Sequence, residues 1–160
     1  MRTVPTSIQT SAYELSVDGI ASLYQLSLKS GAVFYLAPKT TISWQGNLYE
    51  AIPCSLGEMQ IEADGKANRP SFSFANPAGI FTSSVQSGAL NNATLLRRRI
   101  LYDDLINNRN FSITEAMLVA QVMSVTKNMI VLQLRDVHDA HDYMLPARAY
   151  MPPEFPHVKL

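Results

Sequence analysis

The stretch NRPSFSFANPAGIFTSSVQSGALNNATLLRRRILYDDL, residues 68–105, decides the fold. In residues 70–75, Phe72 and Phe74 alternate with small residues, which is the pattern of a half-buried strand. Residues 94–105 predict a second, longer strand after an interruption. No residue pattern between these two strands is typical of an active site.

The interruption predicts a short helix. Asn76 and Pro77 suit the N-cap and first helical positions. Gly88 and residues 91–92 tolerate left-handed backbone, so we expect the helix to end there. The apolar residues that repeat every four positions and would form its buried stripe are Phe81, Val85 and Ala89.

The flanking sequence predicts further short strands joined by turns. Residues 20–28 and 33–37 form a hairpin around Ser30 and Gly31, and residues 45–47 are a three-residue loop between two more strands. The other predicted strands are residues 42–44, 48–51, 57–63, 111–114, 117–125 and 129–134. The fold class is therefore all-β, a mainly antiparallel β-sandwich or barrel with one short helix, over residues 18–145.

Both end segments differ from this β-rich domain. Residues 1–17 are polar with scattered apolar positions, and predict either a short helix or an arm that lies on a neighbouring subunit. Residues 146–160 contain four prolines and predict an extended tail.

Composition excludes several classes of function. The 160 residues have a net charge of zero and only 16% charged residues, which disfavours electrostatic binding to nucleic acid or to an anionic membrane. A surface with so little charge is suited to being covered by protein partners. We find neither a signal peptide nor an apolar run of membrane-spanning length, so we expect the protein to be made and assembled in a cytoplasm.

The histidines and the single cysteine are the candidates for chemistry. His138 and His141 lie among Asp136, Asp139 and Asp142, a mixture that could bind a divalent metal or form an exposed loop. We expect the loop, because the segment has no helical pattern that would place both imidazoles on one face. Cys54 excludes an intrachain disulfide and predicts a small buried side chain. We therefore expect no metal, no cofactor and no catalytic residues.

The arginines at positions 97, 98 and 99 are the only basic run. On a strand, Arg97 and Arg99 point to the face opposite Arg98, so all three cannot be solvated on one face. Pairing with Asp103, Asp104 or the carboxylates of a partner is expected, because arginine suits ion pairs at interfaces. We accordingly expect the run to contribute more to assembly than to folding.

Three aromatic residues are candidates for contact with a partner or ligand. Trp44 at a hairpin turn is expected to be exposed or interfacial, and Tyr102 follows the arginine run. A groove lined by Trp44, Tyr49 and Tyr102 would suit a carbohydrate or another ligand of the host surface. The candidate interface residues are thus Trp44, Arg97, Arg98, Arg99 and Tyr102.

Four blocks of the sequence resemble the phage minor tail protein L family, whose members are tail tip proteins of long non-contractile tails. They are ISWQGNLY (42–49), EADGKANRPSFSFAN (62–76), TLLRRRILYDDL (94–105) and LPAR (145–148). Longer members continue into a cysteine-bearing domain that resembles an iron–sulfur module. With Cys54 alone, this chain cannot hold a four-cysteine cluster, so the resemblance implies the N-terminal domain only.

The resemblance implies a structural subunit of a tail tip or baseplate hub, and no catalytic residues to carry over. Such a subunit would sit in the virion, in a ring between the tail tube and the distal hub or fibre proteins. The neutral charge and the two end segments favour a closed ring with threefold or pseudo-sixfold symmetry. The alternatives are a small β-barrel module that binds host-surface carbohydrate and, third, a metal-dependent hydrolase that uses His138 and His141.

Overall fold

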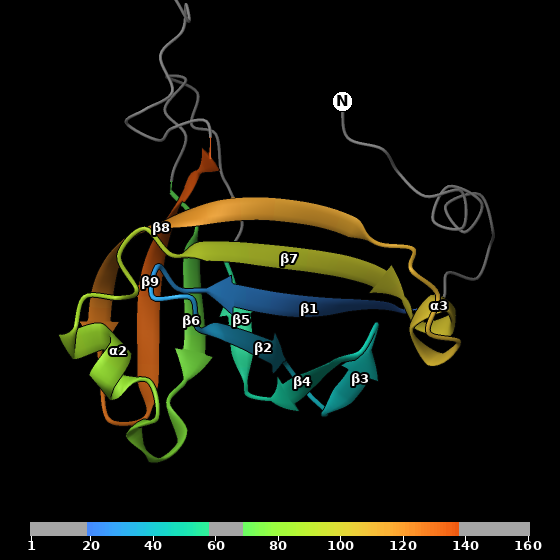
Figure 1. Ribbon diagram of the computed structural model, residues 1–160, viewed down its shortest axis with the longest axis horizontal. Helices are drawn as coiled ribbons and strands as arrows, with labels where there is room; N and C mark the ends of the chain where they lie inside the picture. Colours follow the sequence, from blue (N-terminus) through green and yellow to red (C-terminus); the bar gives the residue numbers. More distant parts are fainter. Residues whose placement is uncertain (1–18, 58–68, 138–160) are drawn as a thin grey trace, which may run out of the picture.

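The computed structural model describes residues 19–57 and 69–137, whose strands form one nine-stranded sheet. The sheet order is β3-β4-β2-β1-β7-β8-β9-β6-β5 (Figure 1). In chain order the strands are β1 (Ile20–Ser27), β2 (Val33–Ala37), β3 (Ile42–Trp44), β4 (Asn47–Ala51), β5 (Cys54–Leu56), β6 (Ser71–Ala75), β7 (Thr94–Leu101), β8 (Ile113–Val125) and β9 (Met129–Asp136). The helical segments are η1 (Pro77–Gly79), α2 (Thr82–Gln86) and α3 (Tyr102–Ile106). The predicted all-β class is confirmed.

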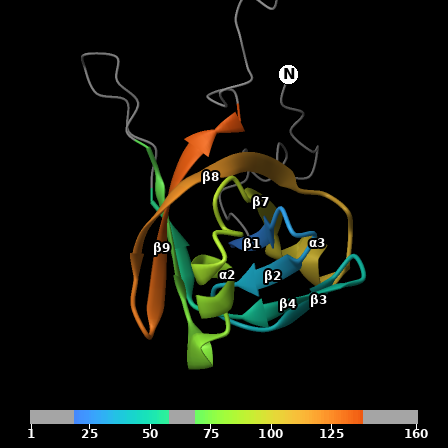
Figure 2. The ribbon, with the colours of Figure 1, turned by 60° about the vertical axis from the view of Figure 1, so that its left-hand side comes forward.

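The consecutive strands β4 and β5 connect the two ends of the strand order. β4 pairs with β2, β5 pairs with β6, and only Ile52 and Pro53 separate the two strands. The Ile52 amide donates to the Ala37 carbonyl at 3.0 Å, and the Pro53 carbonyl accepts from the Ala75 amide at 2.8 Å, which extends both pairings. The sheet therefore curls into a barrel (Figure 2). The β2–β4 pair is parallel and the other pairings among the described strands are antiparallel.

The barrel encloses the larger of two apolar clusters. Most of its buried members come from β1, β2 and β6 to β9; the others are Leu28, Ile52, Phe81, Leu90 and Ala93 in the connecting segments. Phe81 packs edge-on against Phe74 and Phe34, each with ring centroids 5.0 Å away. Because Val85 and Ala89 also pack against this cluster, α2 covers one end of the barrel (Figure 2). The three residues of the predicted apolar stripe therefore do pack on the core, but the single predicted helix is wrong. Ala78, with φ 52°, interrupts it within η1, and α2 ends at Gln86, so only Val85 of the stripe is helical.

The second cluster lies on the outer face of β1, β2 and β7. Along β1, Leu23 belongs to this outer cluster while Tyr24 and Leu26 belong to the inner one, because successive strand residues face opposite sides. The β3–β4 hairpin and α3 cover the outer cluster. Its buried members are Leu23, Ala37, Trp44, Tyr49, Ile100 and Leu105.

The long strand predicted over residues 94–105 is wrong in its last four residues. Strand β7 ends at Leu101, which takes the N-cap position of α3 with extended backbone, φ −64° and ψ 143°. Asp103 and Asp104 lie in the first helical turn, where the helix dipole stabilises carboxylates. The prediction considered only the alternation of a strand and did not use the two adjacent aspartates, which favour the start of a helix.

Three smaller predictions also needed correction. The β3–β4 hairpin has a two-residue turn, Gln45 and Gly46, both with positive φ (50° and 77°), rather than a three-residue loop. β5 was not predicted; Gly57 follows it, and the rest of the strand predicted over 57–63 lies outside the described residues. The strands predicted over 111–114 and 117–125 are one long strand, β8, which pairs with β7 on one side and with β9 on the other. Two register shifts interrupt its pairing with β9, and irregularities of this kind bend a strand.

Candidate interface around helix α3

Strand β7 carries the arginine run and divides it between two faces, as predicted. Arg97 and Arg99 lie on the face of β7 that carries Leu95 of the inner cluster, whereas Arg98 lies on the face of Ile100 in the outer cluster. All three side chains are partly buried and have partners within the chain.

Glu115 of β8 pairs with both arginines of the inner face. Its carboxylate lies 2.6 Å from Nη2 of Arg99 and 3.6 Å from Nη1 of Arg97, its cross-strand neighbour. Burial raises the pKa of nearby Tyr24 above its usual value of 10.0, and the Arg97 charge partly opposes that rise. The predicted pairing of the arginine run with Asp103 or Asp104 is therefore wrong, because Glu115 supplies the carboxylate.

Arg98 is held by neutral groups on the outer face. Its Nη1 donates to Oε1 of Gln25 at 2.8 Å and to the Tyr49 hydroxyl at 3.2 Å. Its guanidinium carbon lies 6.0 Å from the centroid of the Trp44 ring, the outer limit of a cation–π contact. Burial raises the pKa of Tyr49, and Arg98 opposes the rise.

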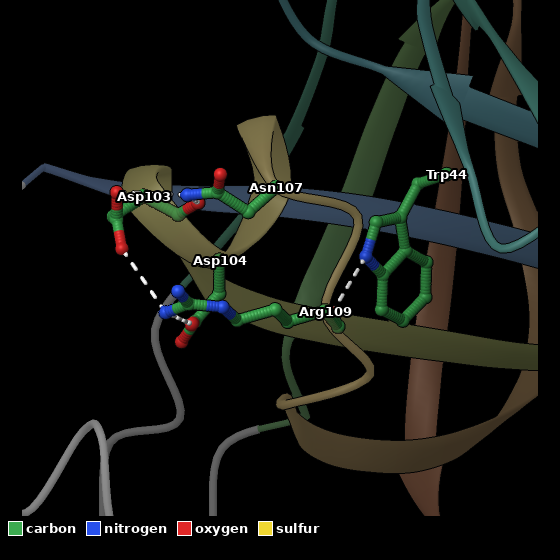
Figure 3. Close-up of polar contacts among 5 residues, drawn as sticks. All are labelled: Trp44, Asp103, Asp104, Asn107 and Arg109. Carbon is green, nitrogen blue, oxygen red and sulfur yellow. Dashed lines mark hydrogen bonds and ion pairs between the residues drawn. The ribbon is translucent and has the colours of Figure 1, made fainter.

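Trp44 is buried within the chain, with 3% of its surface exposed, so the expectation of an exposed tryptophan is wrong. Its indole nitrogen donates to the Arg109 carbonyl at 3.1 Å (Figure 3). The next residue, Gln45, donates from its amide nitrogen to Oδ1 of Asn108 at 2.9 Å and from its side chain to the Asn108 carbonyl at 2.7 Å. These bonds fasten the β3–β4 hairpin to the segment that follows α3.

Polar contacts also fold that segment back onto α3 (Figure 3). Nη1 of Arg109 lies 3.3 Å from the Asp103 carboxylate and 3.5 Å from the buried carboxylate of Asp104. The side chain of Asn107 donates to the carbonyl and the carboxylate of Asp103, at 2.8 and 3.0 Å. Helix α3, residues 107–109 and the β3–β4 hairpin are therefore held together as one unit. Two of the sequence blocks quoted above, 42–49 and 94–105, meet in this unit.

The outer surface of this unit carries two large apolar side chains beside its polar ones. Tyr102 is 53% exposed and Ile106, one turn further along α3, is 71% exposed. Ile20 lies beside them because it pairs with Leu101, the residue before the helix. Ile106 and Ile20 were not predicted as site residues; the i, i+4 spacing from Tyr102 would have identified Ile106 once the helix was recognised.

Two of the three aromatics proposed for a ligand groove are unavailable to a ligand. Trp44 and Tyr49 pack against each other in the outer cluster and are almost fully buried. Only Tyr102 is exposed. A carbohydrate stacks on an accessible ring face, so these three residues do not form such a groove.

The described residues contain no group of three or more His, Cys, Asp or Glu side chains arranged to hold a metal ion. His138 and His141 lie outside those residues, as do the two end segments. Cys54 is free, and burial raises the pKa of its thiol from 9.0 to about 12. A thiol with that pKa is protonated at neutral pH and is therefore a weak nucleophile.

Three comparisons relate the chain to known proteins. Residues 28–152 match the family described as phage minor tail protein L. No curated protein matches the chain. A similar solved structure, from the virion of a native gene transfer agent particle, has a TM-score of 0.64 and 14% identity; the match covers 92% of this chain and 50% of that one. No helix in residues 19–57 or 69–137 is long and apolar enough to cross a membrane.

Proposed function

The chain belongs to the phage minor tail protein L family and is thus a structural protein of a phage-type tail, and we propose that it forms a ring at the tail tip. In this proposal the ring lies between the tail tube and the distal tip proteins. The similar fold found in the virion of a native gene transfer agent particle supports this assignment. The chain spans half the length of that neighbour.

The observation that carries the proposal is the unit formed around α3. Its polar side chains are engaged in bonds within the chain: Trp44 to Arg109, Gln45 to Asn108, and Arg109 to Asp103. Its exposed surface carries two large apolar side chains, Tyr102 and Ile106, beside the ion-paired Asp103 and Arg109. A surface of this kind suits a rigid protein contact, because ordering it on binding costs little conformational entropy.

We also propose that the role is structural rather than catalytic. The charged side chains around α3 form ion pairs within the chain, and general acid–base or nucleophilic catalysis needs a group that is free to reach a substrate. The raised pKa of Cys54 likewise argues against a thiolate nucleophile. The burial of Trp44 and Tyr49 argues against the alternative role in carbohydrate binding.

Localisation in particles tests the proposal. A tagged chain should be seen by electron microscopy as one ring at the distal end of the tail, and particles that lack the chain should have incomplete tips. Removing residues 1–15 or 147–160 should reduce assembly if those segments lie on neighbouring subunits. Detection of the tag along the tube or on the head would contradict a position at the tip.

A further inference from the structure

The exposed large apolar side chains of the described residues come mainly from the two ends of the barrel. Eight of the ten divide into two groups of four according to the part of the fold that carries their backbone. The α3 patch consists of Ile20, Tyr102, Ile106 and Phe111, and the hairpin patch consists of Ile80, Met123, Val125 and Met129. The two patches lie at opposite ends of the barrel, with α3 on the right of Figure 1 and the β8–β9 hairpin on the lower left.

The hairpin patch is built from backbone that lies together. The Asn76 amide donates to the Asn128 carbonyl at 2.8 Å, which joins the start of η1 to the β8–β9 turn. Met129 also pairs with Ala75 at the end of β6. Ile80, just after η1, therefore sits at the same end of the barrel as Met123 and Val125.

This end of the molecule is almost without charge. Residues 70–96 contain no charged residue, and residues 116–134 contain only Lys127, at the tip of the β8–β9 hairpin. Soluble surfaces usually intersperse charged residues among exposed apolar ones, so a nearly uncharged hairpin end with exposed apolar side chains indicates that a partner covers it. The partner should present an apolar surface and one carboxylate for Lys127.

The α3 patch has those two properties. Asp103 lies on α3 between Tyr102 and Ile106; its side chain is 58% exposed and shares Arg109 with Asp104. One arginine between two aspartates leaves an excess negative charge beside the patch, opposite in sign to the single positive charge of the hairpin.

We propose that the hairpin patch of one copy docks on the α3 patch of the next, with Lys127 facing Asp103. This inference rests on the proposed ring and names the two surfaces that would build it. Unlike patches at opposite ends of one subunit produce a head-to-tail contact, and repetition of that contact closes a ring when the rotation per subunit allows. A twofold contact through the hairpin patch would instead bring Lys127 against Lys127, which is unfavourable.

Cysteine cross-linking in assembled particles tests this arrangement. In a Cys54→Ala background, a chain that carries both Ile106→Cys and Met129→Cys should form disulfide-linked ladders of several subunits on oxidation. The matched controls carry Ile106→Cys alone or Met129→Cys alone and should remain single chains. If either control forms dimers, the contact is twofold and the proposal fails. If the double variant is present in tails but remains uncross-linked, another protein covers these patches and the proposal also fails.

Charge exchange supplies an independent test. Lys127→Glu and Asp103→Lys should each reduce association between copies about tenfold, because each places like charges together. The variant with both changes should recover most of the cross-linking, whereas additive losses would overturn the Lys127–Asp103 pairing. The proposed function fails separately, if the unaltered chain is absent from the tail tip.

Discussion

The two ends of the barrel are stabilised by different physical means. At the α3 end, residues 97–115 include seven charged residues, and order depends on ion pairs and hydrogen bonds between distant segments. At the α2 end, order depends on aromatic packing around Phe81 and on one buried amide, that of Asn76. Polar contacts between distant segments hold the α3 end in one conformation, while aromatic packing and the Asn76 side chain hold the α2 end. Substitutions at the two ends should therefore lower stability for different physical reasons.

The largest loss of stability is expected for Trp44→Ala. The change removes a buried ring from the outer cluster and leaves the Arg109 carbonyl without its donor. The free energy of unfolding should fall by about 3–5 kcal/mol, measured by urea denaturation followed by circular dichroism. Trp44→Phe keeps most of the volume and should lose about 1–3 kcal/mol. A loss below about 1 kcal/mol for Trp44→Ala would show that the α3 end is not held through this residue.

The second-largest loss of stability is expected for Arg98→Ala, and comparison with Arg97→Ala distinguishes the contributions of the two arginines. Arg98 donates to Gln25 and Tyr49 within the chain, so its loss should lower stability by about 1.5–3 kcal/mol. Arg97→Ala is the matched control, because its 3.6 Å pair with Glu115 is partly exposed and worth about 1 kcal/mol or less. The sequence instead predicts that the arginine run contributes more to assembly than to folding. Equal melting temperatures for wild type and Arg98→Ala would support that prediction.

At the opposite end, Asn76→Ala should cost about 1–2 kcal/mol. Oδ1 of this buried residue accepts from the Phe81 amide at 3.0 Å, and Nδ2 donates to the Thr82 hydroxyl at 3.1 Å. Asn76→Asp keeps the acceptor and should lose less. Hydrogen exchange should show faster exchange in α2 while α3 stays protected. Equal loss of protection at both ends would mean that the two ends unfold as one unit.

Alkaline pH should lower the free energy of unfolding because two tyrosine side chains, Tyr24 and Tyr49, are buried. Burial raises the pKa of Tyr24 and Tyr49 above 10.0, so the phenols of the unfolded chain ionise first. The contribution of these phenols to stability should therefore be constant below about pH 9 and fall as pH rises through 10. Cys54, with its pKa raised to about 12, should contribute in the same direction from about pH 9. Unfolding at about pH 8 and about pH 10.5 should show a smaller decrease for Tyr49→Phe than for wild type. An equal decrease would exclude Tyr49 as a source.

Strand alternation and turn residues predicted most of the barrel, because those signals are local. They located β1, β2, β6, β9 and α2, and the opposite faces of Arg97 and Arg98. The family resemblance, now confirmed over residues 28–152, supplied the assignment to a phage tail.

The predictions that were wrong concern features that depend on contacts between residues far apart in the sequence. Trp44 is buried because the segment after α3, 65 residues away, covers it, and no local pattern encodes that cover. Glu115 rather than Asp103 pairs with the arginines because β8 lies beside β7 in the sheet. The apolar α3 patch was missed because Tyr102 and Ile106 share a face only once residues 102–106 are helical.

The smallest effect is expected at Gln45, where two contributions oppose each other. Its positive φ of 50° is strained for a residue with a Cβ, and glycine would remove about 1 kcal/mol of that strain. Glycine would also lose the side-chain donor to the Asn108 carbonyl, a partly solvated bond worth about 0.5–1.5 kcal/mol. Gln45→Gly should therefore change stability by less than about 0.5 kcal/mol.

Gln45→Ala is the informative control for that change, because it loses the hydrogen bond and keeps the strain. It should be destabilised by about 1 kcal/mol relative to Gln45→Gly, measured by urea denaturation with Trp44 fluorescence as the probe. The difference between the two variants measures the strain stored in the turn that fastens the β3–β4 hairpin to the α3 end. If the two variants are equally stable, the turn is unstrained. The attachment would then depend on the hydrogen bonds to Asn108 and Arg109 alone.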